Sequence, residues 1–278
     1  MKKVKFDSEY FNIKDTLECG QVFRFKAHGK GFLCFSEDKC AYCYQENDWA
    51  VIECDKENTK YFENYFDLAR DYSYIVKSAT LEGVEKLTLS ANRGKGIRIL
   101  NQNTVEALVS FVVSQNNNIP RIKRIIERLC EGLGERKTFG QVEYFAFPSV
   151  KAMAQAPLSF YKSIGLGYRA EYIKGLAEKL DSGFDINRLK ALNTNDLRKE
   201  LIKIKGVGAK VADCALLFGF HRSDSFPVDT WIEKVYREDF KGTIKDRAKI
   251  AQYLADRFKE NAGYYQQYLF HYKRMGEK

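Results

Sequence analysis

The stretch Leu201-Ile-Lys-Ile-Lys-Gly-Val-Gly-Ala-Lys-Val-Ala-Asp-Cys214 decides the fold of this 278-residue chain. Apolar residues at helical spacing lie on both sides of Gly206-Val-Gly208, so the pattern predicts two helices joined by a tight turn, over about residues 196–219. Glycines permit positive φ angles and let the turn backbone approach another molecule closely. The first amides of the second helix would then be free to hold a phosphate oxygen. Turns of this kind also occur in proteins that bind no phosphate.

Lys210 is the residue of this stretch best placed for chemistry. It lies in the first turn of the second helix, where burial and the positive end of the helix dipole favour the neutral, nucleophilic amine. Cys214 follows four residues later on the same helix face. Asp229 stands where a later helix is expected to begin, and a role as its N-cap would by itself explain an aspartate there. The amine could also attack a sugar carbon, and the fixed carboxylate could stabilise the cation that develops.

The rest of the chain divides into a strand-rich first part and a helical second part. Alternating apolar residues predict an antiparallel sheet between about residues 21 and 54, with strands at 21–25, 31–35 and 39–44. We expect an N-terminal β domain with flanking helices over residues 1–93 and an all-α domain over residues 94–278, which makes the fold class α+β. Helices are expected at residues 196–204, 209–219, 230–238, 246–261 and 264–274.

A polar run, Ser114-Gln-Asn-Asn-Asn118, separates two helical repeats, and Pro120 suits the first turn of the second. The amides of Asn116 to Asn118 can face outward together at this junction. A plain helix cap and turn is the alternative interpretation of the same residues.

Composition narrows the class of protein. A formal net charge of +9 is compatible with a polyanionic partner. Seven scattered cysteines, an odd number, argue against a disulfide framework, and Cys40-Ala-Tyr-Cys43 is a lone pair without histidines at ligand spacing. We therefore expect neither a metal nor a cofactor. The charged start of the chain lacks the apolar region of a signal peptide, and no apolar run could span a bilayer, so we expect a cytoplasmic protein that does not bind membranes.

Together these segments resemble the helix-hairpin-helix DNA glycosylases of the HhH-GPD superfamily, and much of the chain looks like a bacterial-type 8-oxoguanine DNA glycosylase. The hairpin followed by Pro227-Val-Asp229 carries the resemblance, and three more segments match in order: Cys19-Gly-Gln-Val-Phe-Arg24, Ser114-Gln-Asn-Asn-Asn-Ile-Pro-Arg121 and Gly165-Leu-Gly-Tyr-Arg-Ala170. The match runs from about residue 17 to the C-terminus. It implies a TBP-like N-terminal sheet followed by a helical glycosylase core.

The resemblance also implies a reaction, a bifunctional DNA glycosylase and AP lyase that excises 8-oxoguanine from double-stranded DNA. Lys210 would attack the anomeric carbon and form a Schiff base that permits β-elimination, with Asp229 in support. The Gly20 carbonyl would accept a hydrogen bond from the protonated N7 of 8-oxoguanine, which guanine cannot donate. Cys214 and Phe270 would sandwich the flipped base, and Gln266 would read its Watson–Crick edge.

The resemblance further implies contacts with the DNA around the lesion. Asn116, Arg121, Tyr168 and Arg169 would fill the vacated stack and meet the opposite base, while Gly206 and Gly208 would hold the backbone. Both arginines favour cytosine opposite the lesion, although guanidinium groups at these positions could equally contact phosphates. The chain departs from eukaryotic relatives at Trp231, where they carry a histidine, and at Lys273, where they carry an acidic residue.

Three alternatives to this function stay open at the level of sequence. A glycosylase for alkylated bases would lack the lysine nucleophile. An endonuclease III-like enzyme for oxidised pyrimidines usually has a C-terminal cluster of four cysteines, whereas no cysteine follows Cys214 here. A non-catalytic helix-hairpin-helix protein would need the hairpin without Lys210 and Asp229 converging on one pocket. We expect a monomer that acts at the bacterial nucleoid.

Overall fold

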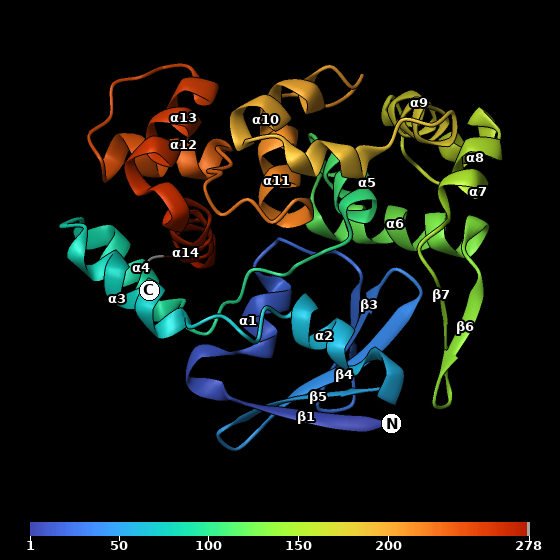
Figure 1. Ribbon diagram of the computed structural model, residues 1–278, viewed down its shortest axis with the longest axis horizontal. Coiled ribbons are helices and arrows are strands. Elements are labelled where there is room, and N and C mark those ends of the chain that lie inside the picture. The colour runs from blue at the N-terminus through green and yellow to red at the C-terminus, as the bar shows by residue number, and fades with distance from the viewer. Residues whose placement is uncertain (277–278) are drawn as a thin grey trace.

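A sheet and a helical layer make up the computed structural model of the chain, which describes residues 1–276 (Figure 1). The last two residues of the expected helical domain, 277 and 278, lie outside the described residues. The sheet occupies one end of the molecule, and most of the helices lie above it. No helix within residues 1–276 is long and apolar enough to cross a lipid bilayer.

The N-terminal sheet is antiparallel, and its five strands have the order β1-β5-β4-β3-β2. Its core includes Cys43, Ile52 and Phe62 and lies beneath two helices. The predicted strands at 31–35 and 39–44 are confirmed. The strand predicted at 21–25 begins only at Phe25. Residues 21–24 are all buried, whereas the predicted strand would have one face in solvent. The strands are β1 (Lys2–Asp7), β2 (Phe25–His28), β3 (Gly31–Ser36), β4 (Lys39–Glu46) and β5 (Trp49–Cys54), and the helices of this part are η1 (Ser8–Tyr10), α1 (Ile13–Glu18), η2 (Lys56–Asn58) and α2 (Thr59–Tyr65).

The helices predicted at 209–219 and 230–238 are confirmed to the residue, and that at 246–261 is an α-helix with a short 3-10 turn at its end. Asn103, Asn118 and Asp229 each cap a helix through a side-chain oxygen, which explains why the starts of these helices are well defined. The remaining helices are α3 (Tyr72–Leu81), α4 (Glu85–Arg93), α5 (Thr104–Ser114), α6 (Ile119–Leu133), α7 (Val150–Gln155), α8 (Leu158–Ser163), α9 (Arg169–Asp181), η3 (Ile186–Ala191), α10 (Thr194–Ile202), α11 (Ala209–Gly219), α12 (Thr230–Glu238), α13 (Arg247–Phe258), η4 (Lys259–Asn261) and α14 (Ala262–Met275).

The sequence led us to expect an entirely helical second half, but the structure also contains two strands there. A hairpin of β6 (Arg136–Phe139) and β7 (Val142–Phe145) extends from the helical layer down beside the sheet (Figure 1). Phe139 packs in a small cluster with Leu33 and Phe35, and the ring of Tyr144 lies 5.3 Å from that of Phe35. The hairpin therefore covers apolar side chains of the sheet that would otherwise face water.

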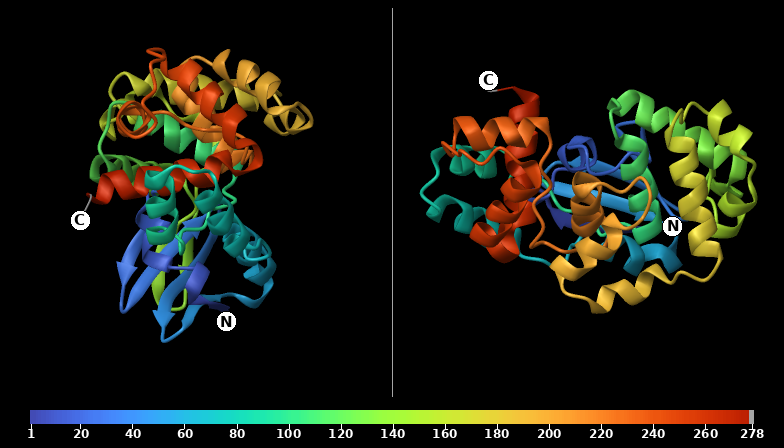
Figure 2. Two further views of the ribbon diagram at one scale, coloured as in Figure 1. Left: turned by 90° about the vertical axis from the view of Figure 1, so that its left-hand side faces the viewer. Right: turned by 90° about the horizontal axis from the view of Figure 1, so that it is seen from above.

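The hydrophobic cores of the sheet and of the helical layer both draw on the chain between residues 72 and 100. Tyr72, Leu87 and Ala91, from α3 and α4, belong to the core of the helical layer, whereas Leu100 belongs to the core of the sheet. Helix α14 crosses between the helical layer and the sheet domain, next to α3 and α4 (Figure 2). The chain between α4 and α5 thus runs back to the sheet before it enters the helical layer again.

A buried ion pair joins the two parts. Nη1 of Arg24 lies 3.0 Å from Oε1 of Glu106 on α5, and both side chains are more than nine-tenths buried. Oε2 of Glu106 accepts the backbone N–H of Glu37, and Nη2 of Arg24 donates to the carbonyl of Phe145 on β7. This network holds the sheet, α5 and the hairpin in one arrangement.

Replacing Arg24 by Met should lower the free energy of unfolding by about 3–5 kcal/mol, because the Glu106 carboxylate stays buried without its counter-charge. The double change Arg24→Met with Glu106→Gln should recover much of this loss, since an amide can still accept the Glu37 N–H. Urea denaturation measures both values. Arg136→Met, at the exposed pair with Glu143, is the control and should change little. A double variant as unstable as Arg24→Met would contradict the role given to the charge.

Candidate active site

A small cavity of about 40 Å³ brings together residues from five distant parts of the chain. It adjoins a wider groove of about 680 Å³, and five residues line both. The cavity contains all six residues predicted for catalysis and base binding, from the turn after α1, from α11, from the start of α12 and from α14. Its lining comprises Gly20, Phe111, Lys210, Cys214, Phe218, Pro227, Asp229, Gln266, Gln267 and Phe270.

Lys210 lies in the first turn of α11, as predicted. Its Nζ is 5.2 Å from the centroid of the Phe111 ring, so one side of the amine faces an apolar surface. The Cys214 thiol, one turn later, is 3% exposed. Burial raises the pKa of Cys214 to about 11, although the nearby Lys210 acts in the opposite direction. The thiol is therefore neutral near pH 7 and offers an apolar wall beside the amine.

Asp229 is the N-cap of α12, which confirms the helix start predicted there from the sequence. Its Oδ1 accepts the backbone N–H groups of Trp231 and Ile232, each at 2.9 Å. These two bonds fix the carboxylate in one orientation at the positive end of the helix. A role as helix cap alone would not require Asp229 to line a cavity. Asp229 nevertheless lines the same cavity as Lys210.

Gly20 and α14 form another wall of the cavity. Gly20 has a φ of +94°, and a Cβ at this position would lie 2.9 Å from Nη1 of Arg274 and 3.2 Å from the ring of Phe270. No side chain is tolerated at residue 20 without movement of these groups. Gln266, one turn before Phe270, is 5% exposed, and its Oε1 has no hydrogen-bond partner among residues 1–276. An acceptor of this kind is available to a bound molecule.

The loop between α5 and α6 lines the groove and is held from two sides. Asn116 has a φ of +44°, which is uncommon for a residue other than glycine. The Arg169 guanidinium donates to the carbonyls of Gln115 and Asn116, and Nε2 of Gln115 donates to the carbonyl of Gly206 at 2.9 Å. The loop is thus tied to both α9 and the hairpin turn.

The residues predicted to meet the opposite base differ in exposure. Tyr168 is 52% exposed, and Arg121 is exposed with Nη2 3.1 Å from the carbonyl of Gly165. Arg169 is only 3% exposed, because its guanidinium is bonded to the loop backbone. Contact between Arg169 and an opposite base would require the guanidinium to leave these carbonyls.

The two glycines of the hairpin turn have different conformations. Gly206 has a φ of +88°, and a Cβ there would overlap the ring of Tyr172. Gly208 has a φ of −86°, so only Gly206 uses the positive φ that a glycine permits. A Cβ on Gly208 would meet open space, which leaves the backbone at the start of α11 accessible from outside.

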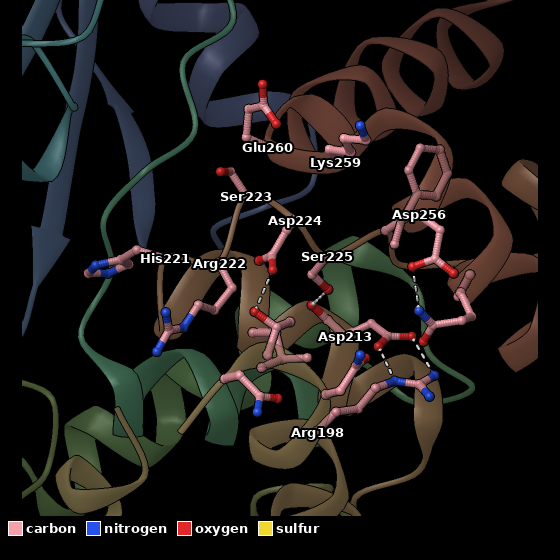
Figure 3. Close-up of a pocket in the computed structure, with 18 residues that line it drawn as sticks. Arg198, Asp213, His221, Arg222, Ser223, Asp224, Ser225, Asp256, Lys259 and Glu260 are labelled. Carbon is pink, nitrogen blue, oxygen red and sulfur yellow. Dashed lines mark hydrogen bonds and ion pairs between the residues drawn. The ribbon is translucent and has the colours of Figure 1, made fainter. Parts of the chain in front are cut away.

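A hollow of about 790 Å³ lies apart from this site and shares none of its lining residues (Figure 3). Arg198 of α10 and Asp213 of α11 line it, and their side chains form an ion pair with an Nε–Oδ1 distance of 2.6 Å. The pair joins the two helices of the hairpin and so helps to fix α11, which carries Lys210. The hollow contains no residue predicted for catalysis or DNA binding.

Sequence reasoning missed several residues of the site. Phe111, Phe218 and Gln267 line the cavity, and Arg274 lines the groove. Phe111 and Phe218 lie in apolar helices where nothing distinguishes them from core residues. Arg274 follows Phe270 by four residues and Gln266 by eight, so helical spacing could have placed it on the same face of α14. Within residues 1–276, no group of three or more His, Cys, Asp and Glu side chains could hold a metal ion.

Two family models together match most of the chain. One, described as "8-oxoguanine DNA glycosylase, N-terminal domain", matches residues 3–108. The other, described as "HhH-GPD superfamily base excision DNA repair protein", matches residues 109–260.

Curated relatives and a solved structure are also similar to this chain. A "Probable N-glycosylase/DNA lyase" of Methanothermobacter thermautotrophicus is 29% identical over 240 residues, which is 79% of this chain and 75% of that protein. The "N-glycosylase/DNA lyase" of Saccharomyces cerevisiae is 36% identical over 160 residues, 53% of this chain and 43% of that protein. The Clostridium acetobutylicum 8-oxoguanine glycosylase/lyase, in complex with double-stranded DNA containing cytosine opposite 8-oxoguanine, is 32% identical with a TM-score of 0.92, over 100% of this chain and 99% of that one. The chain therefore belongs to the HhH-GPD superfamily of base excision DNA repair proteins, in the family of the 8-oxoguanine DNA glycosylases.

Proposed function

We propose that this protein excises 8-oxoguanine from double-stranded DNA, opposite cytosine, and then cleaves the strand at the abasic site. One observation carries the proposal: Lys210, Asp229 and the four residues expected to bind the base line a single cavity. The adjoining groove, lined by the Asn116 loop, offers a place for the duplex from which the base is flipped. The protein would act as a monomer at the nucleoid.

In the first step, the neutral Lys210 amine attacks C1′ of the damaged nucleotide. The bond from C1′ to N9 breaks, and its electron pair leaves with the base, which takes up a proton. Positive charge develops on the sugar as this bond lengthens, and the fixed Asp229 carboxylate lies at the same cavity to stabilise it. The Lys210 amine lies beside the Phe111 ring, and the neutral Cys214 thiol follows one turn later on the same helix.

In the second step, the secondary amine at C1′ loses a proton, and its nitrogen lone pair forms the C=N bond of a Schiff base. The bond from C1′ to the ring oxygen O4′ breaks, and O4′ takes up a proton to become a hydroxyl group. Loss of a proton from C2′ then moves electrons toward the iminium nitrogen, and the bond from C3′ to its phosphate oxygen breaks. Lys210 holds the positive charge that makes this proton acidic. The same side chain thus serves both base release and strand cleavage.

Base selection rests on Gly20, Gln266 and Phe270. The Gly20 carbonyl can accept a hydrogen bond from the N7–H group of 8-oxoguanine, whereas guanine has a lone pair at N7 that would repel the carbonyl oxygen. The unpartnered Oε1 of Gln266 can accept an N–H from the Watson–Crick edge. Phe270 and Cys214 supply the two faces between which a flipped base would stack.

The residues at the rim are proposed to act on the DNA around the lesion. Asn116 enters the vacated stack, and the exposed Tyr168 and Arg121 meet the neighbouring bases and the opposite cytosine. Gly206 and Gly208 present backbone amides to a phosphate. Arg169 keeps the Asn116 loop in place, and joins the contact with the opposite base only if it is released from the Gln115 carbonyl.

Lys210→Gln should abolish covalent trapping by borohydride on a duplex that carries 8-oxoguanine, because an amide cannot form a Schiff base. Denaturing gel electrophoresis of the protein–DNA adduct measures the trapped fraction. The matched control is Lys205→Gln, an exposed lysine of the same hairpin, which should be trapped like the unaltered protein. Trapping of Lys210→Gln at the unaltered level would refute the nucleophile, and an enzyme trapped only on oxidised pyrimidines would favour the endonuclease III-like alternative.

Asp229→Asn should slow single-turnover base release by roughly 10²–10³-fold, since the negative charge that stabilises the sugar cation is removed. Asparagine caps helices about as well as aspartate, so the melting temperature should hardly change. Excision rates and thermal unfolding, measured on the same preparations, separate the two roles. An unchanged excision rate would mean that Asp229 is only a helix cap.

A further inference from the structure

One face of α14 carries three residues at four-residue spacing, Gln266, Phe270 and Arg274. Two of them present buried polar atoms without a partner among residues 1–276, Oε1 of Gln266 and Nη1 of Arg274. The proposed function gives Gln266 a ligand in the edge of the base. It leaves Arg274 without a role, although Arg274 lines the same groove as Lys210 and Asp229.

Arg274 lies beside both groups between which 8-oxoguanine would be recognised. Its Nη1 lies 2.9 Å from the position of a Cβ on Gly20, and its guanidinium carbon lies 5.8 Å from the centroid of the Phe270 ring. Its Nη2 donates a hydrogen bond to the carbonyl of Glu18, the last residue of α1. Arg274 therefore ties the turn after α1 to the helix that carries Phe270.

The turn itself is held at each neighbouring carbonyl. The Cys19 carbonyl accepts from Nε2 of Gln267 at 3.0 Å, and the Gln21 carbonyl accepts from Nε2 of Gln102 at 2.8 Å. With Glu18 bonded to Arg274, the carbonyls of residues 18, 19 and 21 are all occupied. The Gly20 carbonyl between them accepts no hydrogen bond from the part of the chain that the structure describes.

We propose that Arg274 is a positioning residue that determines specificity for 8-oxoguanine, an inference that rests on the proposed function. By holding the Glu18 carbonyl, it sets the distance between the free Gly20 carbonyl and a base stacked on Phe270. Hydrogen bonds weaken steeply with distance and angle, so both the attraction to the N7 proton and the repulsion of guanine N7 depend on this spacing. The buried Nη1 keeps a donor available beside the bound nucleotide.

The test is binding of DNA by variants that also carry Lys210→Gln and therefore do not turn over. Dissociation constants are measured by fluorescence anisotropy for three duplexes, with 8-oxoguanine, guanine or a tetrahydrofuran abasic analogue opposite cytosine. Arg274→Met keeps the aliphatic stem against Phe270 but removes the donors. It should reduce the preference for 8-oxoguanine over guanine about tenfold, the effect of roughly one hydrogen bond, while binding of the other two duplexes changes less than twofold.

Two further variants serve as controls. Arg274→Lys can still reach the Glu18 carbonyl and should retain an intermediate preference. Lys273→Ala removes the neighbouring cation, which pairs with Glu238 instead of facing Gly20, and should leave the preference unchanged. Thermal unfolding identifies any variant that does not fold, and Arg274→Lys then provides the comparison.

The outcomes separate this inference from the function on which it rests. If the Lys210→Gln protein shows no preference for 8-oxoguanine over guanine, the proposed substrate is wrong, and the inference falls with it. If that preference is present but Arg274→Met keeps it, the function stands and the role of Arg274 is refuted. Equal weakening on all three duplexes would also refute it, because Arg274 would then contribute only charge or stability.

Discussion

The site depends on one constraint: the sheet and the helical layer must keep a fixed orientation relative to each other. Gly20 belongs to the connection that leads into the sheet, whereas Lys210 belongs to the helical layer. The Arg24–Glu106 pair, buried where the two parts meet, holds them by charge and by hydrogen bonds to backbone on each side. Because an isolated buried charge is so unfavourable, the two parts cannot slide past each other without a large penalty. The pair thus helps to hold the distant segments that form the candidate site in one arrangement.

Local signals allowed some of the fold to be predicted from sequence with great accuracy. Helices α11 and α12 begin where expected because Gly208 and Asp229 mark their starts, and both signals act within a few residues. The β6–β7 hairpin was missed because its strands are short and are stabilised by contact with Phe35 of the sheet, more than a hundred residues earlier. The strand predicted at residues 21–25 was placed too early for a related reason, since that segment is buried between the two parts and not on a half-exposed surface.

The candidate site was predicted largely through resemblance, and the structure adds what residue identity alone does not contain. Lys210, Asp229 and Gly20 could be named, but their meeting in one cavity is a consequence of tertiary packing. The guanidinium of Arg169 is bonded to the loop backbone, which no local pattern indicates. Arg274 escaped notice because an arginine near the end of a helix ordinarily interacts with the helix dipole or with solvent. Its hydrogen bond to the Glu18 carbonyl and its position beside Gly20 and Phe270 distinguish it.

The bond from Gln115 to Gly206 has a geometric consequence for a molecule that must find one nucleotide among many. It connects the loop that would enter the base stack with the turn that would grip the phosphate backbone. Under the proposed function, a duplex held at the turn would meet the loop at one fixed offset along its axis. A step of one phosphate at the turn would then present the next base pair to the loop in the same register. The hairpin would then fix the spacing between the phosphate that it holds and the base pair that the loop meets, and inspection of the duplex would proceed in steps of a single nucleotide.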